Sequence, residues 1–148
     1  APTPGELDDD DKAALAACYT ALAEVSKAID GRRFRDGLRA AMRLARHGNQ
    51  YVDSKEPWKV VKVDKETAGT ALWVSLNVIS TLRTVFYPYL PTSADKIHSM
   101  LFQSSDTLAD GWNRREIVPG APIEKPVRLF TKLDDSIIEE ENARLAGE

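Results

Sequence analysis

Apolar residues recur at intervals of three and four along most of this chain, which is the period of an amphipathic α-helix. The first such segment covers about residues 12–29. Its apolar face carries Leu15, Tyr19, Leu22, Val25 and Ile29. The aspartates from Asp8 to Asp11 precede it, where the helix dipole favours negative charge, and Gly31 follows it as a residue that accepts a left-handed cap. Residues 1–7 form a lead-in that we expect to be poorly ordered at its start.

The second helical segment, about residues 33–52, carries two stripes with helical spacing. The apolar stripe, which we expect to be buried, contains Phe34, Leu38, Ala41, Ala45, Asn49 and Val52. The other stripe, here called the arginine face, contains Arg32, Arg35, Arg39, Arg43 and Arg46. At about 100° per residue, the two stripes lie about 120° apart around the helix axis. The sequence therefore predicts a buried face flanked by a continuous basic face.

Asn49 is the one polar member of that apolar stripe. A buried amide without partners costs about 1–3 kcal/mol, so we expect Asn49 to bond the backbone of the corner at Pro57 and Trp58. That corner is predicted because the residue before a proline avoids helical geometry. The alternative is that Asn49 lies at the edge of the stripe, where its amide reaches water.

Two further helices follow the corner. The segment from about residue 65 to residue 89 is apolar on more than one side, which indicates a central helix. Pro91 ends it, and the residues from Thr92 to Asp95 open a fourth helix. This fourth helix should turn three apolar residues inward: Ile97, Met100 and Leu101.

The last third of the chain has fewer helical signals. Residues 105–133 contain several prolines and glycines, and we interpret them as a strap that lies across the bundle. Its expected anchors are Trp112, Leu129 and Phe130. A short final helix should cover about residues 135–145. The prediction is thus an all-α domain over 1–148, with a bundle of about four main helices over residues 8–104, the strap, and the final helix.

The composition is that of an ordinary globular domain: 148 residues, 43% of them hydrophobic and 29% charged. No apolar run is long enough to span a bilayer, and the N-terminus is polar and acidic, so we expect a cytoplasmic protein with no membrane partner. The net charge of −3 argues against indiscriminate nucleic-acid binding, and we expect no DNA partner. Residues 31–62 nevertheless hold nine basic and three acidic residues, which gives the molecule a basic side.

The chain offers little catalytic chemistry. A lone Cys18 cannot form an internal disulfide, and with only two histidines beside it a zinc site is not expected, so we interpret Cys18 as a small buried residue. Asp95 and His98 lie three residues apart, and we interpret them as a surface ion pair at helical spacing. Phosphate-binding glycine loops and nucleophile motifs are absent. We expect no catalytic residue, metal or cofactor on this chain.

Nucleic-acid recognition fits the residues better. Trp58 stands beside Lys55, Lys59 and Lys62, and a flat ring among cations can stack an unpaired base while the cations neutralise phosphates. Two other interpretations remain open. Five arginines on one helix side can serve solubility alone, and Trp58 can be a core aromatic at a corner. The other two tryptophans, Trp73 and Trp112, are interpreted as structural.

Four blocks of sequence, in order, resemble the anticodon-binding domain of methionyl-tRNA synthetases. The first block, residues 49–53 followed by Pro57 and Trp58, is similar to the signature N-x-Y-[IV]-[DE]…P-W. The second is the helix junction over 87–101, the third Trp112 with Gly120 and Pro122, and the fourth residues 125–134, similar to K-P-x-P-L-F-x-K-[IL]-[DE]. Val127 stands where the family usually has proline. The resemblance covers residues 12–140.

The resemblance implies a helix bundle of a class I synthetase that recognises the anticodon stem-loop of a methionine tRNA. It implies that Trp58 stacks on anticodon bases. From their charge, we expect the arginine face, Lys59 and Lys62 to lie near phosphates. The RNA-binding residues we expect are Trp58, Asn49, Lys59, Lys62, Arg35, Arg39 and Arg43. The family's base-reading Asn and Arg on a preceding helix are not in this sequence.

The resemblance also implies a parent enzyme that ligates methionine to its tRNA with ATP. The catalytic H-I-G-H and K-M-S-K-S motifs and the zinc-binding knuckle are absent here, so we expect the catalytic domain to be a partner outside this chain. ATP with magnesium, and zinc where the knuckle is present, would bind there. The alternatives are the corresponding domain of an isoleucine or valine synthetase, and a helical module that docks a protein.

Overall fold

The structure, a computed structural model, describes residues 1–104, 107, 109, 111–132, 134 and 136–146, without the side chains of 139, 140 and 146. Its helices, in order, are α1 (Asp9–Asp30), α2 (Phe34–Lys55), α3 (Pro57–Val60), α4 (Lys65–Phe86), α5 (Pro91–Phe102) and α6 (Ser136–Ala146). These described residues contain no strand, so the all-α prediction is confirmed. None of the described helices has the length and apolar character needed to cross a membrane.

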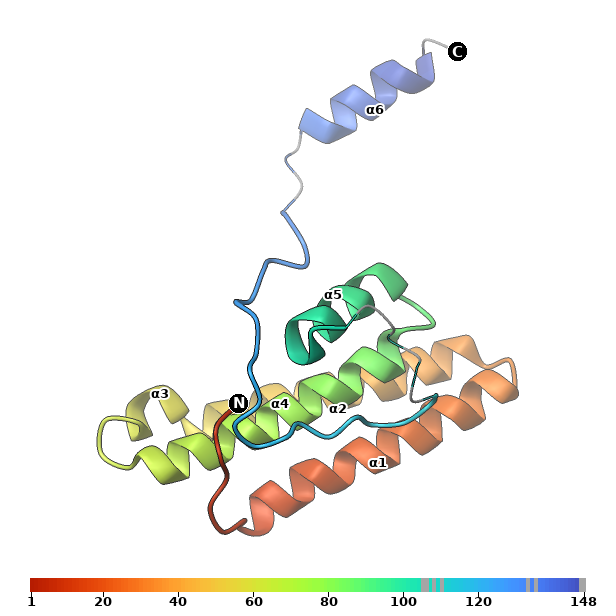
Figure 1. Ribbon diagram of the computed structural model, residues 1–148. Helices are drawn as coiled ribbons and strands as arrows, with labels where there is room; N and C mark the ends of the chain where they lie inside the picture. The colour runs from red at the N-terminus through yellow and green to blue at the C-terminus, as the bar shows by residue number, and fades with distance from the viewer. Residues whose placement is uncertain (105–106, 108, 110, 133, 135, 147–148) are drawn as a thin grey trace.

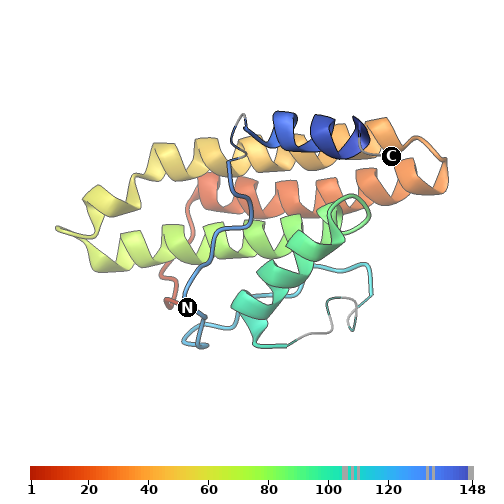
Figure 2. The same cartoon turned by 90° about the horizontal axis from the view of Figure 1, so that it is seen from above.

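The core lies between three long helices. Figures 1 and 2 show α1, α2 and α4 side by side, with α5 packed against α4. The buried residues between them are mostly small, including Ala14, Cys18, Ala41 and Val78, and small side chains allow helices to pack closely. Cys18 is fully buried, as expected, and this burial raises the pKa of its thiol.

Local signals explain where the helices start. Asp8 caps α1 by accepting from the Asp11 N–H at 2.9 Å, while the Asp11 carboxylate accepts from the Asp8 N–H. Asp64 caps α4 by accepting from the N–H groups of Glu66 and Thr67. The bond from the Thr67 hydroxyl, together with these backbone bonds, lowers the pKa of Asp64. The expectation that Gly31 adopts a left-handed conformation is wrong. Its φ is −80°, and Arg32 adopts the left-handed conformation instead, at φ 57°.

The buried face of α2 is also different from the predicted one. Phe34 is 58% exposed and Leu38 is 39% exposed. Ala41 is buried as predicted, and the other buried residues of the helix are Gly37, Ala40, Leu44 and Tyr51, which the predicted stripe did not include. Two glycines explain the shift, because a Cβ on Gly37 would lie 2.4 Å from the Tyr89 hydroxyl and one on Gly48 would lie 3.0 Å from Val78. The helix therefore packs through its small residues rather than its largest ones.

The central position of α4 is confirmed, with Trp73, Val74, Val78 and Val85 all buried. Polar residues are buried on the same helix, which the apolar pattern did not predict. The buried polar residues of α4 are Thr70, Asn77, Ser80, Thr81, Arg83 and Thr84. Several of them hold the strap, which crosses α4 as an extended segment.

Alternate strap residues meet successive turns of α4. Ser80 Oγ donates to the Arg115 carbonyl at 2.5 Å, and Thr84 Oγ1 donates to the Asn113 carbonyl at 3.0 Å. Ile117, which is 2% exposed, is bound twice: its carbonyl accepts from Trp73 Nε1 at 2.8 Å, and its N–H donates to Asn77 Oδ1 at 3.2 Å. The spacing of two along the strap thus matches one helical turn of α4.

The expected anchors of the strap are confirmed only in part. Trp112 is half-buried and its Nε1 donates to the Leu22 carbonyl at 3.0 Å, whereas Phe130 is 66% exposed and Leu129 is half-buried. Ile117 is the anchor that the sequence did not identify. The ends of the predicted strap, residues 105 and 133, lie outside the described residues.

The lead-in is more ordered than expected. The Gly120 N–H donates to the Ala1 carbonyl at 2.9 Å, and the Gly5 N–H donates to Thr70 Oγ1 at 2.8 Å. These bonds fix residues 1–5 against the strap and α4, so the expectation of poor order at this end is wrong.

The two C-terminal helices behave differently. In α5, Leu101 is buried as predicted, and so is His98, whose Nδ1 lies 2.8 Å from an Arg83 nitrogen. The expected surface ion pair of His98 with Asp95 is therefore wrong, and Asp95 accepts from the Thr107 hydroxyl instead. Figure 1 shows α6 standing away from the bundle, with Ile138 and Leu145 exposed.

Candidate nucleic-acid interface

The corner between α2 and α3 is formed by Glu56 and Pro57. Glu56 has φ 41° and ψ 52°, a left-handed conformation that is unusual for a residue with a side chain. Pro57 is buried at the first position of α3, where its missing N–H costs no hydrogen bond. The amides of Lys59 and Val60 both donate to the Glu56 carbonyl, so a one-turn helix starts at once.

Trp58 is the second residue of that turn and is 51% exposed. Trp73 is 6% exposed and bonded to the strap, so the two tryptophans differ as the sequence predicted. An indole half in solvent presents a face to which a planar ring can bind, while its other part remains against the protein. The interpretation of Trp58 as a core aromatic is therefore wrong.

The lysines near Trp58 point in different directions. Lys59 is exposed and its Nζ lies 2.5 Å from Glu56 Oε1, and Lys62 is exposed on the loop that follows α3. Lys55, which we expected beside the ring, is turned away toward α1. Its Nζ lies 2.5 Å from Asp8 Oδ2 and 3.0 Å from Asp11 Oδ1.

Asn49 does not occupy the core position that the sequence predicted. Its side chain is exposed, and among the described residues it makes no hydrogen bond to the corner. It lies at the edge of the seam between α2 and α4, beside a hollow of about 100 Å³. The shift of the buried face of α2 explains this, because Gly48 rather than Asn49 faces Val78.

The arginine face is exposed along α2. Arg39 lies 3.8 Å from Asp36, an exposed and weak pair, and Arg35 has no ion pair among the described residues. Arg43 binds Glu24 of α1, with 2.6 Å between Nη2 and Oε2. These side chains keep their charge accessible to solvent, as phosphate contacts require.

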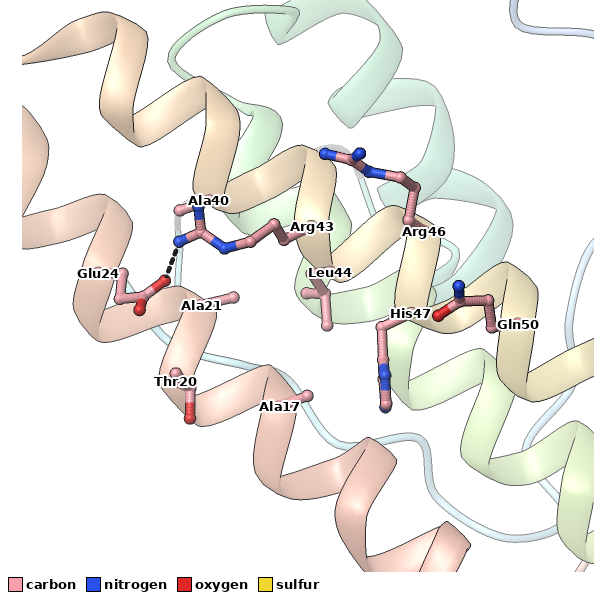
Figure 3. A pocket seen from close by; sticks show the side chains of 10 residues that line it. All are labelled: Ala17, Thr20, Ala21, Glu24, Ala40, Arg43, Leu44, Arg46, His47 and Gln50. Atoms are coloured by element: carbon pink, nitrogen blue, oxygen red, sulfur yellow. Dashed lines mark hydrogen bonds and ion pairs between the residues drawn. The ribbon is translucent and has the colours of Figure 1, made fainter.

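A groove runs between α1 and α2 beside this face, with a volume of about 520 Å³. Figure 3 shows Arg43 reaching across it to Glu24, with Arg46 and Gln50 extending from α2. Gln50 was not among the predicted site residues, although it lies seven residues after Arg43 and therefore on the same side of the helix. Hydrogen-bond donors thus extend the arginine face toward the corner.

The predicted residues form two groups rather than one cluster. Trp58, Lys59 and Lys62 lie at the corner, and the three arginines lie along α2. Arg43 is 12 residues before Lys55, the last residue of α2, which corresponds to about 18 Å along the helix axis. A ligand that contacts both groups must be an extended one.

Charges, hydrogen bonds and burial at the helix ends behind the corner shift the pKa values of three residues. The bond and charge of Lys55 lower the pKa of Asp8. Burial opposes the charge of Lys55, but its bonds to Asp8 and Asp11 raise the pKa of this lysine above its usual value. Burial, with the bond to Asp11, raises the pKa of Tyr51. The described residues contain no cluster of three His, Cys, Asp or Glu side chains that could hold a metal.

Comparison with known protein families identifies one match over the whole chain. The family described as the anticodon binding domain of methionyl tRNA ligase matches residues 1–148. A methionine–tRNA ligase of Roseiflexus sp. (strain RS-1) is 37% identical over 97% of this chain. One of Dehalococcoides mccartyi (strain ATCC BAA-2266 / KCTC 15142 / 195) is 43% identical over 84% of it. The chain corresponds to only 29% and 22% of these relatives.

Solved structures show the same similarity. The free form of Mycobacterium tuberculosis methionyl-tRNA synthetase aligns with 90% of this chain at a TM-score of 0.80 and 26% identity. The same enzyme bound by methionyl-adenylate aligns with a TM-score of 0.79. Here too the match covers a minor part of the larger protein, 28% and 26%.

Proposed function

Because the chain belongs to the family of methionyl-tRNA ligase anticodon-binding domains, we propose that it binds the anticodon stem-loop of a methionine tRNA through the corner and the arginine face. In this proposal Trp58 stacks on an unpaired anticodon base. Lys59, Lys62, Arg35, Arg39 and Arg43 lie near phosphates, and Asn49, exposed between the two groups, contacts the RNA by hydrogen bonds.

The half-exposed ring of Trp58 is the observation that supports this most strongly. The ring is large and apolar, and the corner holds it half in solvent, where its face is available for stacking. The distance between corner and arginine face also suits RNA, because a stem-loop offers unpaired bases at its tip and a line of phosphates behind them.

Replacing Trp58 with alanine tests the proposal. Base stacking on an aromatic ring contributes about 1–3 kcal/mol, so Trp58→Ala should weaken binding of a methionine tRNA anticodon stem-loop about 5- to 150-fold. The free energy of unfolding should change little because the ring is exposed. Fluorescence anisotropy with labelled RNA and denaturant unfolding measure the two effects.

Trp73→Ala is the matched control, since it removes the same side chain from the core and should cost about 3–5 kcal/mol of stability. If Trp58→Ala unfolds the domain in the same way, or leaves RNA affinity unchanged, the proposal that Trp58 stacks on an anticodon base is wrong.

We further propose that the chain acts as one part of a larger methionine–tRNA ligase, with its bundle over about 8–104, its strap over 105–133 and its final helix over 135–145. The parent enzyme would join methionine to tRNA in the cytoplasm. ATP, with magnesium and zinc, would bind its catalytic portion. The relatives' length and the methionyl-adenylate bound by the M. tuberculosis enzyme support this.

We also propose that the catalytic portion of the parent enzyme docks on a second surface of this chain. An apolar groove of about 760 Å³ lies between α2, α4, α5 and the strap. Among the residues that line it are Met42, Leu76, Ile79, Ile97, Leu129 and Phe130. It explains why α4 is apolar on its outer side. Because this chain spans only 29% and 22% of the relatives' length, we propose the rest of the parent polypeptide as the occupant.

This docking proposal predicts that Phe130→Ser, at a 66% exposed position, leaves the isolated chain as stable as before. In the full-length enzyme the same change should weaken association of the two portions and lower the melting temperature. An unchanged full-length enzyme would contradict it, as would dimer formation by the isolated chain.

A further inference from the structure

One polar network, buried except for the exposed Asp8 carboxylate, joins the N-terminal end of α1 to the C-terminal end of α2, directly behind the corner. The Tyr51 hydroxyl donates to Asp11 Oδ1 at 2.7 Å, and Lys55 Nζ reaches Asp11 at 3.0 Å and Asp8 at 2.5 Å. Tyr51 and Asp11 are 5% and 3% exposed, and the Lys55 side chain is 14% exposed. Buried charges of this kind persist where each has its partners.

This network lies next to the corner in the sequence, so it can fix the backbone of the corner. Lys55 is the last residue of α2, and the next residue is Glu56, with its left-handed backbone at φ 41°. A side-chain-bearing residue keeps such a conformation only when its surroundings determine it. On the far side of Glu56, Pro57 is buried and α3 packs against α4. On the near side, the network fixes Lys55.

The orientation of Trp58 depends on these flanks. Its ring is 51% exposed, and α3 has only four residues, too few for a helix that is stable by itself. A ring that is fixed before the RNA arrives loses less freedom on binding, which improves affinity.

We propose that Asp11, Tyr51 and Lys55 are positioning residues for Trp58: they hold the end of α2 so that the indole is set for stacking. The inference rests on the proposed function of Trp58 in RNA binding. Tyr51, the tyrosine of the sequence block at residues 49–53, then supports the recognition surface from below and does not contact RNA, since it is buried. It also replaces Asn49 as the residue that fixes the corner.

The test uses Lys55→Met, which keeps the length of the side chain and removes its charge. The first measurement is the NMR signal of the Trp58 indole N–H, identified by its loss in Trp58→Phe. This signal should shift or broaden in Lys55→Met and return in Lys55→Arg. Ser80→Ala, which removes a strap bond at a distance from the corner, should leave the signal in place although it destabilises the fold.

The second measurement is the affinity for the anticodon stem-loop in a double-mutant cycle. Lys55→Met should weaken binding when Trp58 is present, by no more than the about 5- to 150-fold expected for Trp58→Ala. In a Trp58→Ala background it should have no effect. Tyr51→Phe, which removes a single hydroxyl, repeats both measurements if Lys55→Met does not fold.

The outcomes separate the two proposals. An unmoved indole signal overturns the positioning role, and so does an equal loss of affinity with and without Trp58. If Trp58→Ala leaves RNA affinity unchanged, the stacking function fails first. The indole signal then still decides whether the network positions the ring.

Discussion

At the scale of single residues, the charges behind the corner should make stability depend on pH in a defined way. Lys55 lowers the pKa of Asp8 below its ordinary 3.8, so this contribution is present above that value and is lost as pH falls through the pKa in the folded state. The pKa of Lys55 is raised, so its contribution is present below about 10.5 and is lost as pH rises further. Between these limits the ion pair should contribute fully.

Lys55→Met should therefore cost about 1–3 kcal/mol of unfolding free energy at neutral pH, because Lys55 is a charged hydrogen-bond partner with little exposure. The difference from the unmodified protein should stay level between about pH 5 and 9 and shrink below pH 4. Urea unfolding at pH 3, 5, 7 and 9 measures it. A difference that is the same at pH 3 as at pH 7 would show that the network contributes through packing rather than charge.

The sequence predicted some residues well and others poorly, for physical reasons. The exposed, stacking interpretation of Trp58, one of two left open, and the structural interpretation of Trp73 agree with their exposure, because one follows a helix-breaking proline and the other lies within an apolar helix. Asn49 was predicted to be buried because helical spacing defines a stripe of residues but does not show which stripe packs against the neighbouring helix. The packed side of α2 is set by Gly37 and Gly48, which have no side chain and so allow other residues to approach the helix closely. Partners 40 or more residues apart, such as Tyr51 and Asp11, leave no local pattern.

At the scale of helices and strap, Asn77 is a buried residue that links the strap to α4. Its amide donates to the Trp73 carbonyl at 3.0 Å and its oxygen accepts from the Ile117 N–H at 3.2 Å, with no exposure to solvent. Asn77→Ala would leave the Ile117 N–H buried without that acceptor. We expect a loss of about 1–3 kcal/mol and faster hydrogen exchange at Ile117.

Ser75→Ala provides the comparison, because Ser75 Oγ bonds only the Ala71 carbonyl of its own helix among the described residues. Exchange at Ile117 should be unchanged in this variant. Equal exchange rates in Asn77→Ala and the unmodified protein would mean that Trp73 alone holds this part of the strap. No hydrophobic pattern indicates such bonds, which explains why the strap was predicted but its anchor Ile117 was not.

At the scale of the whole molecule, the distribution of charge matters more than its sum. The net charge is −3, yet Arg35, Arg39 and Arg43 present exposed cations on one side of α2. If each contacts a phosphate, replacing all three with glutamine should lower the slope of log affinity against log salt by roughly 0.7–0.9 per lost contact. Binding titrations of the stem-loop at several salt concentrations give the slope.

Lys12, Lys65 and Lys96 supply the matched control, since all three are exposed and lie outside the arginine face. Their replacement with glutamine changes the net charge by the same amount and should leave the slope close to that of the unmodified protein. If both triple variants change the slope equally, the arginine face acts through net charge alone and makes no phosphate contacts.

The pairing of alternate strap residues with turns of α4 has a consequence for the order in which parts of the chain fold. Asn113, Arg115 and Ile117 find their partners only on a helix that already exists, since Trp73, Asn77, Ser80 and Thr84 share one side only when helical. Each contact also closes a long loop, whose entropy is lost before the contact forms. The strap should dock after the rate-limiting step of folding. Weakening it at Asn77 should then speed unfolding and leave the folding rate unchanged.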